Sequence, residues 1–150
     1  MSKISIIAVG KLPSEYSDIA KHFMKMLGNS LTQHEIVIKK NINSAEIMEY
    51  EADAIFSKIT GSDFIILLDP VGERFDSHKF AEYFQKTSDN NDKISFIIGG
   101  AWGVSNKIKA RANKTISLSN LTFTHMLARI ILLEQIYRAR AITNNHPYHK

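Results

Sequence analysis

Two stretches of the chain decide its fold: FIILL (residues 64–68) and ISFIIGG (residues 94–100). Each contains a short apolar run, and the second run is followed by two glycines. A short, continuous apolar run is typical of a strand that is covered on both faces, as strands in parallel sheets are. The two runs therefore predict the centre of a parallel sheet.

The segments around these runs alternate between strand and helix patterns. DPVGERFD (residues 69–76) is expected to be a loop, and a short basic helix is expected after Ser105, its predicted cap. No internal repeat or linker interrupts the chain, so residues 1–150 are expected to form one α/β domain, a parallel sheet flanked by helices. Further strands are expected at residues 4–9, 34–40 and 116–119, and further helices at residues 14–27, 44–59, 77–87 and 125–140.

The expected helices differ in how their apolar residues are arranged. In the first, Ser14 is the expected N-cap, Gly28 the stop, and Ile19 one of the inward positions. In the second, the acidic residues are expected to face outward. The last helix contains MLARIILL (residues 126–133), which is apolar nearly all round. Because a domain of this size has little room to bury a helix on every side, we expect this helix to contact a second subunit.

The composition excludes several classes of protein. The chain has 150 residues, of which 44% are hydrophobic and 23% charged, and it contains no cysteine. A disulfide scaffold and a thiolate zinc site are therefore excluded. The N-terminal apolar run is too short for a signal peptide, and no stretch reaches the roughly 18 apolar residues that span a bilayer. A cytoplasmic protein without membrane contact is expected.

The charge is unevenly distributed along the chain. Residues 101–150 contain eight Lys or Arg residues and one acidic residue, Glu134, although the net charge of the whole chain is only +4. Such an asymmetry indicates a polyanionic partner, with nucleic acid the first candidate. A solvated basic face without a partner is the alternative.

Three expected strand ends carry loops that suit a ligand: residues 68–72, 99–103 and 118–124. Ligands in open α/β sheets bind outside the carboxyl ends of the strands, and glycine there lets the backbone approach a ligand closely. The loops are suited to hold a small, flat, uncharged ring through backbone hydrogen bonds. A plain tight turn is an equally good interpretation of the glycine pair. Motifs of P-loop proteins and of serine hydrolases are absent from the sequence.

The C-terminus, ITNNHPYHK (residues 142–150), is unusually rich in side chains that suit RNA. Arg129, Arg138 and Arg140 precede or adjoin it and are expected to neutralise phosphates, while Tyr148 and the histidines are suited to stack on an extruded base. An ordinary polar terminus is the alternative. A metal site at His125, His146 and His149 is disfavoured, because no carboxylate lies near them in sequence and zinc needs a further ligand.

Several of these segments together resemble a known family. AVGK (residues 8–11), IIGGAWG (97–103), LSNLTFTH (118–125), LLEQIYRARAIT (132–143) and NHPYH (145–149) resemble the RlmH (YbeA) family of SPOUT-class methyltransferases, over nearly the whole chain. The resemblance implies a sheet with a C-terminal trefoil knot, a homodimer and S-adenosyl-L-methionine as cofactor. It also implies methylation of N3 of pseudouridine 1915 in 23S ribosomal RNA, in the large subunit or the assembled ribosome.

The chemistry of the implied reaction suggests roles for residues of the tail, and the resemblance itself implies the cofactor contacts. His149 or His146 is expected to take the proton from the imide nitrogen, and Arg138 to stabilise the resulting anion, with Tyr148 beside them, on a tail that completes the active site. A non-catalytic RNA-binding module remains an alternative, as does a nucleotide-linked oxidoreductase, although the acidic residue that would hold a ribose is missing. The implied cofactor contacts are Leu68, Gly100, Ser119, Asn120, Leu121, Thr122, Phe123 and Thr124, and no metal is implied.

Overall fold

The sheet has five parallel strands in the order β2-β1-β4-β3-β5 in the computed structural model, which describes residues 2–150. FIILL and ISFII pair with each other near its centre, with Phe64 opposite Ile94. The predicted α/β class and parallel sheet are therefore confirmed. The strands are β1 (Lys3–Val9), β2 (Leu31–Ile36), β3 (Phe64–Arg74), β4 (Lys93–Ile98) and β5 (Lys114–Ser117).

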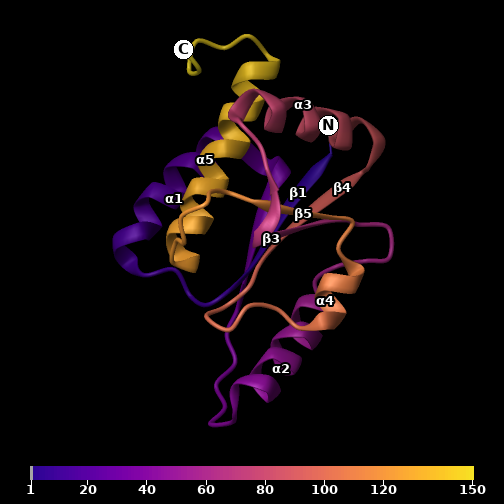
Figure 1. The fold of residues 1–150 in the computed structure, drawn as a ribbon. Coiled ribbons are helices and arrows are strands. Elements are labelled where there is room, and N and C mark those ends of the chain that lie inside the picture. Colours follow the sequence, from indigo (N-terminus) through magenta and orange to yellow (C-terminus); the bar gives the residue numbers. More distant parts are fainter. Residues whose placement is uncertain (1) are drawn as a thin grey trace.

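Helices cover both faces of this sheet (Figure 1). Three of them, α1, α3 and α5, pack on one face, while α2 and α4 pack on the other. In the part of the chain that the structure describes, no helix is long and apolar enough to cross a membrane. The helices are α1 (Ser14–Leu27), α2 (Ser44–Phe56), α3 (Ser77–Asn90), α4 (Asn106–Arg111) and α5 (His125–Thr143).

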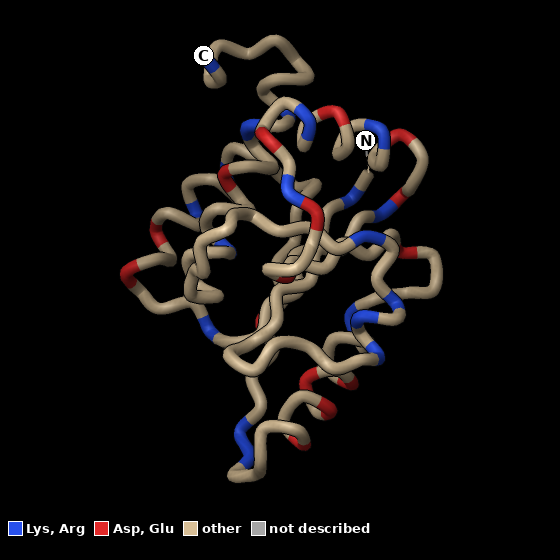
Figure 2. Tube along the Cα trace, viewed as in Figure 1, with Lys and Arg blue, Asp and Glu red and all other residues tan. Residues whose placement is uncertain are grey.

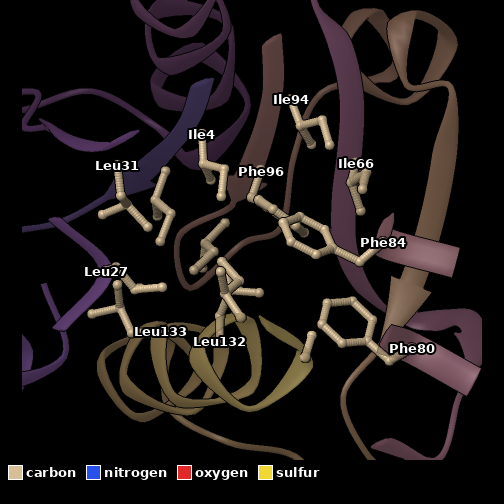
Figure 3. Packing of buried hydrophobic residues seen from close by; sticks show 14 of the residues in the cluster. Ile4, Leu27, Leu31, Ile66, Phe80, Phe84, Ile94, Phe96, Leu132 and Leu133 are labelled. Carbon is tan, nitrogen blue, oxygen red and sulfur yellow. The ribbon is translucent and has the colours of Figure 1, made fainter. Parts of the chain in front are cut away.

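Side chains along each strand alternate between two apolar cores. On β4, Phe96 belongs to the core under α1, α3 and α5, whereas its neighbour Ile97 belongs to the core under α2 and α4. Figure 3 shows Phe96 beside Phe84 of α3, above Leu132 of α5. Each such side chain contributes about 1.5–3 kcal/mol when it is fully buried. Burial on both faces explains why these strands are continuously apolar.

Three strand predictions were wrong at their boundaries, and one of them is the strand expected at residues 116–119, which is β5, Lys114–Ser117. The strand expected at residues 34–40 is β2, Leu31–Ile36, because its partner β1 ends at Val9, opposite Ile36. The expected loop 69–76 is largely part of β3, which continues to Arg74. Leu68 and Glu73 both pair with Ile116 of β5, so residues 69–72 bulge out between two pairing segments.

Several helix details also differ from the predictions. Pro13 occupies the N-cap position of α1, and Ser14 is its first helical residue. Ile19 is 47% exposed rather than inward, and Glu51 of α2 is buried rather than outward. Ser105 does occupy the N-cap of α4, but its hydroxyl makes no capping hydrogen bond. Gly28, with a positive φ of 72°, ends α1 as predicted, because a left-handed residue at this position favours glycine.

Candidate functional site

A cavity of about 480 Å³ opens at the carboxyl ends of β3, β4 and β5. It is lined by all three loops that the sequence singled out, although these are separated by up to about 50 residues. The pairing of three parallel strands brings their carboxyl ends to one edge, which is where ligands bind in such sheets. Of the predicted cofactor contacts, seven line the cavity: Leu68, Gly100, Ser119, Leu121, Thr122, Phe123 and Thr124.

Asn120 is the predicted cofactor contact that does not line the cavity. Its side-chain oxygen accepts a hydrogen bond from Arg74, the last residue of β3. Beside it, the hydroxyl of Ser119 accepts a hydrogen bond of 3.0 Å from the backbone N–H of Leu121. These contacts hold the loop after β5 in a defined path along the cavity.

The first loop is shaped by the bulge in β3. At Gly72 the backbone passes so close to β5 that a Cβ atom would lie 2.5 Å from the carbonyl carbon of Ile116. Only glycine allows this approach without moving one of the two strands. The bulge places Asp69 and Pro70 against the cavity, as expected of the first of the three ligand loops, although they were not among the individual cofactor contacts expected from the resemblance.

The second loop is a tight turn between two glycines. Gly103 has a φ of 80° and donates a backbone hydrogen bond of 3.0 Å to the carbonyl of Gly100. A Cβ on Gly99 would lie 2.7 Å from Val104, so this position is closed to larger residues. The sequence left a plain tight turn as an alternative to a ligand loop, and the segment is both a tight turn and part of the cavity wall.

A buried carboxyl group lies behind the second loop. Glu51 of α2 is 9% exposed, and a Cβ on Gly100 would lie 3.6 Å from its Oε1 atom. Burial raises the pKa of Glu51, so its carboxyl group keeps its proton to higher pH than an exposed glutamate does. The helical pattern of α2 did not predict this, because acidic residues usually face the solvent.

The third loop leads into α5, whose first turn forms one wall of the cavity. Thr124 caps the helix by accepting a hydrogen bond of 3.3 Å from the backbone N–H of Leu127. His125 lies against Gly10 at the end of β1, where a Cβ would be 2.8 Å from its Nε2 atom. The start of α5 is thereby fixed against the end of β1.

The predicted tail residues lie at the opposite end of α5 (Figure 1). A helix of 19 residues is about 28 Å long, and this length separates the tail from the first turn beside the cavity. The structure therefore brings seven of the eight predicted cofactor contacts together, but it places Arg138, His146, Tyr148 and His149 away from the cavity of the same chain.

The tail is held by a network of polar contacts. Glu134 accepts hydrogen bonds from Arg138, at 2.7 Å and 3.0 Å, and from the hydroxyl of Tyr148, at 3.0 Å. Burial, together with the hydrogen bond to Glu134, raises the pKa of Tyr148. The Nη1 atom of Arg138 lies 3.0 Å from Nδ1 of His149, whose Nε2 lies 3.0 Å from Nε2 of His78.

This network fixes the tautomer of His149. A guanidinium group only donates, so Nδ1 of His149 must accept from Arg138, and its Nε2 carries the proton that is donated to His78. Neither ring nitrogen then has a free lone pair. The other candidate is His146, whose Nδ1 atom accepts a hydrogen bond of 3.2 Å from the backbone N–H of Tyr148. His149 must leave this arrangement before it can accept a proton from a substrate.

Two of the three arginines expected to meet phosphates are internal instead. Arg129 is 2% exposed and bonds to Glu35 and to the carbonyl of Gly10, both at 2.8 Å. Arg140 is partly buried, donates to the carbonyl of Leu27 at 3.1 Å, and has its pKa lowered by burial. The sequence could not show this, because an arginine on an apolar helix has the same spacing whether it is paired inside or free outside. Figure 2 shows the basic residues spread over several elements.

Comparison with known families identifies the family to which this fold and its cavity belong. A sequence model described as "Predicted SPOUT methyltransferase" matches residues 2–149. The chain belongs to the SPOUT methyltransferase family. The α/β sheet and the cavity at its carboxyl edge are thus those of a methyltransferase, and the family implies a methyl donor as the ligand.

Individual relatives agree with this assignment over their full length. The chain is 42% identical over 151 residues to "Ribosomal RNA large subunit methyltransferase H" of Pseudothermotoga lettingae, covering 98% of this chain and 99% of that one. It is 40% identical to the protein of the same name from Streptococcus thermophilus, with 99% of both chains covered. The resemblance to the RlmH family found in the sequence is therefore confirmed.

A solved structure supports the fold. "The structure of a probable methylase family protein from Haemophilus influenzae Rd KW20" aligns with a TM-score of 0.58, covering 99% of this chain and 71% of that one, at 16% identity. In the SPOUT methyltransferase described here, no group of three or more His, Cys, Asp or Glu side chains within residues 2–150 is arranged to hold a metal ion. His125 and the two tail histidines lie at opposite ends of α5, so they do not form one site.

Proposed function

We propose that this protein transfers a methyl group from S-adenosyl-L-methionine to N3 of a pseudouridine in large-subunit ribosomal RNA. The observation that carries the proposal is the cavity at the carboxyl edge of the sheet, lined by three loops with backbone groups and few charges. Its volume of about 480 Å³ is within the usual range for small-molecule sites. The names of the relatives support ribosomal RNA as the substrate.

The residues around the cavity fit such a donor. Gly99, Gly100 and Gly103 leave the backbone accessible, and Leu68, Leu121 and Phe123 offer apolar contact to a flat ring. When bound, the sulfonium of S-adenosyl-L-methionine supplies the methyl group together with a good leaving group. The protein then has to hold the acceptor nitrogen in line with that group, and such positioning is worth about 7–11 kcal/mol at best.

A homodimer is part of the proposal. A second groove, lined by Phe75, Phe80, Phe123 and Ile131, lies between α3 and α5 and adjoins the cavity. On α5, Leu127 is 40% exposed, one helical turn before Ile131 and two before Gln135, which also lines this groove. This open apolar stripe supports the subunit contact expected from the sequence.

The dimer supplies a route for the tail to reach a cavity. If two α5 helices pack antiparallel along these stripes, the C-terminal end of one lies beside the N-terminal end of the other. Arg138, Tyr148 and His149 of one subunit would then complete the cavity of its partner, where a released His149 takes the imide proton and Arg138 faces the anion. After β5, the chain passes the ends of β3, β4 and β1. This path is compatible with the expected C-terminal trefoil knot. A cytoplasmic location follows from the proposed substrate.

Two experiments test the proposal. Titration calorimetry with S-adenosyl-L-methionine is expected to give saturable heat, whereas titration with NAD is expected to give none. A non-catalytic RNA-binding module would bind neither. Mass spectrometry of large-subunit RNA from cells that lack the protein is expected to show one pseudouridine without its methyl group, and an unchanged methylation pattern would contradict the proposal.

A further inference from the structure

The most exposed of the Phe, Tyr and Trp side chains that the structure describes lies between two residues that line the cavity. Trp102 is 66% exposed, although its two neighbours, Ala101 and Gly103, both line the cavity. An indole presents a large apolar surface, and leaving it in water forgoes the favourable free energy of burial. A ligand that binds from solution would gain free energy by covering this indole.

The loop presents this side chain in a defined direction. The backbone hydrogen bond from Gly103 to Gly100 closes the turn around Ala101 and Trp102, and the two glycines also form an antiparallel bridge. The residues before the turn are tightly packed, because a Cβ on Gly99 would lie 2.7 Å from Val104 and one on Gly100 would lie 2.9 Å from Val9. The base of the turn is thus fixed, and the indole is carried at its tip.

Two more exposed apolar side chains lie at or next to the cavity lining. Val71, in the bulge next to the lining residue Pro70, is 89% exposed, and Leu121, itself a lining residue, is 73% exposed. Two exposed lysines follow on α4, which begins three residues after Gly103: Lys107, which pairs with Glu49 at 2.9 Å, and Lys109. A partner that fits this arrangement combines a flat apolar ring with negative charge beside it.

We propose that Trp102 stacks on the nucleobase that receives the methyl group, and so holds the extruded base over the mouth of the cavity. The inference rests on the proposed function, because it takes an RNA base as the substrate. A base that leaves its helix loses stacking with its neighbours, and an aromatic side chain replaces part of that loss. The exposed ammonium group of Lys109 offers a positive charge to a phosphate next to the base.

The test compares Trp102→Ala and Trp102→Phe with the wild-type protein, using ribosomes from cells that lack the protein as substrate. At saturating donor, kcat/KM of Trp102→Ala is expected to fall roughly 5- to 150-fold, which corresponds to stacking of about 1–3 kcal/mol per base. Trp102→Phe is expected to recover most of this loss. Tyr50→Ala, which removes another exposed aromatic residue from α2, is the control and is expected to leave kcat/KM unchanged.

Further readouts separate stacking from other roles. The affinity for S-adenosyl-L-methionine and the thermal midpoint are expected to be the same in Trp102→Ala and wild type. Trp102 is the one tryptophan of the chain, so quenching of its fluorescence by acrylamide measures its exposure directly. It is expected to be quenched nearly as strongly as free tryptophan amide at concentrations where the protein is dimeric.

Each contrary result has a definite meaning. If the wild-type enzyme methylates RNA and the kcat/KM of Trp102→Ala is within twofold of the wild-type value, the stacking role of Trp102 is overturned and the proposed function is not. Loss of donor affinity in Trp102→Ala, or of its dimeric mass in sedimentation, also overturns it, because the indole would then serve the donor site or the subunit contact. A wild-type protein that transfers no methyl group overturns the proposed function and this inference with it.

Discussion

The guanidinium group of Arg129 donates a hydrogen bond of 2.8 Å to the carboxylate of Glu35, across 94 residues of sequence. The contact joins α5 to β2, and a second bond of 2.8 Å joins the same arginine to the carbonyl of Gly10. Burial acts to raise the pKa of Glu35, but the hydrogen bonds from Arg129 and from the backbone N–H of Leu12 outweigh it and lower the pKa. The pair fixes the helix whose first turn forms one wall of the cavity at the carboxyl edge of the sheet.

Removing Glu35 is expected to cost more stability than removing Arg129. The side chain of Arg129 is 2% exposed and that of Glu35 is 37% exposed, so Glu35→Ala leaves a buried charge while Arg129→Met leaves a hydrated one. We expect Glu35→Ala to lower the free energy of unfolding by about 3–5 kcal/mol in urea. The double variant should be less destabilised than the sum of the two single variants, and simple additivity would show that the pair is not coupled.

The close approach at Gly72 predicts a specific loss of stability. A Cβ at this position would meet the backbone of Ile116, so Gly72→Ala has to displace the bulge or β5. We expect a loss of about 1–3 kcal/mol in urea unfolding, together with weaker donor binding in calorimetry, because both strands end at the cavity. Gly61→Ala is the matched control, since nothing lies within 4 Å of its Cβ position. Equal effects of the two substitutions would contradict the structural reason.

The buried carboxylate of Asp63 predicts how stability depends on pH. Its side chain is 1% exposed, pairs with Lys93 at 2.9 Å and accepts from the hydroxyl of Ser95 at 2.9 Å. Burial alone would raise the pKa of Asp63, but the hydrogen bonds from Lys93, Thr60 and Ser95 lower it below the ordinary value of 3.8.

Because the folded-state pKa is the lower one, the stabilisation by Asp63 is complete above the ordinary value and is lost as the pH falls through the folded-state pKa. We expect Asp63→Asn to be about 1–3 kcal/mol less stable than wild type at pH 7, with the two curves converging as the pH falls below 3.8 and through the folded-state pKa. Urea unfolding between pH 2 and pH 7 measures both curves. Asp18→Asn, at an exposed position on α1, is the control, and its free energy of unfolding should follow that of wild type over the whole pH range.

Mixed dimers test whether the tail acts across the subunit contact of the proposed homodimer. One chain lacks residues 148–150, and the other carries Thr122→Trp, which fills the donor cavity from an exposed loop position. Each homodimer is expected to be inactive. If the tail acts on the partner's cavity, the mixed dimer has one complete site and about half of the wild-type methylation rate per dimer. An inactive mixed dimer would show that the tail serves its own chain.

The sequence predicted the parts of this protein that depend on local pattern. Apolar runs such as FIILL and ISFII determine strands because both of their faces are covered, and Gly28 ends α1 because its backbone is left-handed. The three loops that line the cavity could be predicted as well, since the carboxyl ends of parallel strands meet at one edge. Composition alone excluded disulfides and thiolate metal sites.

Only the tertiary structure decided which side chains are free and which are paired. Arg129, Arg140 and Glu51 have patterns typical of surface residues, yet the folded chain buries them against groups that lie far away in sequence. The bulge at residues 69–72 likewise arises from two separate pairings of β3 with β5. Pairing, burial and close backbone approach depend on long-range contacts, and residue spacing contains no information about those until the strands and helices have packed.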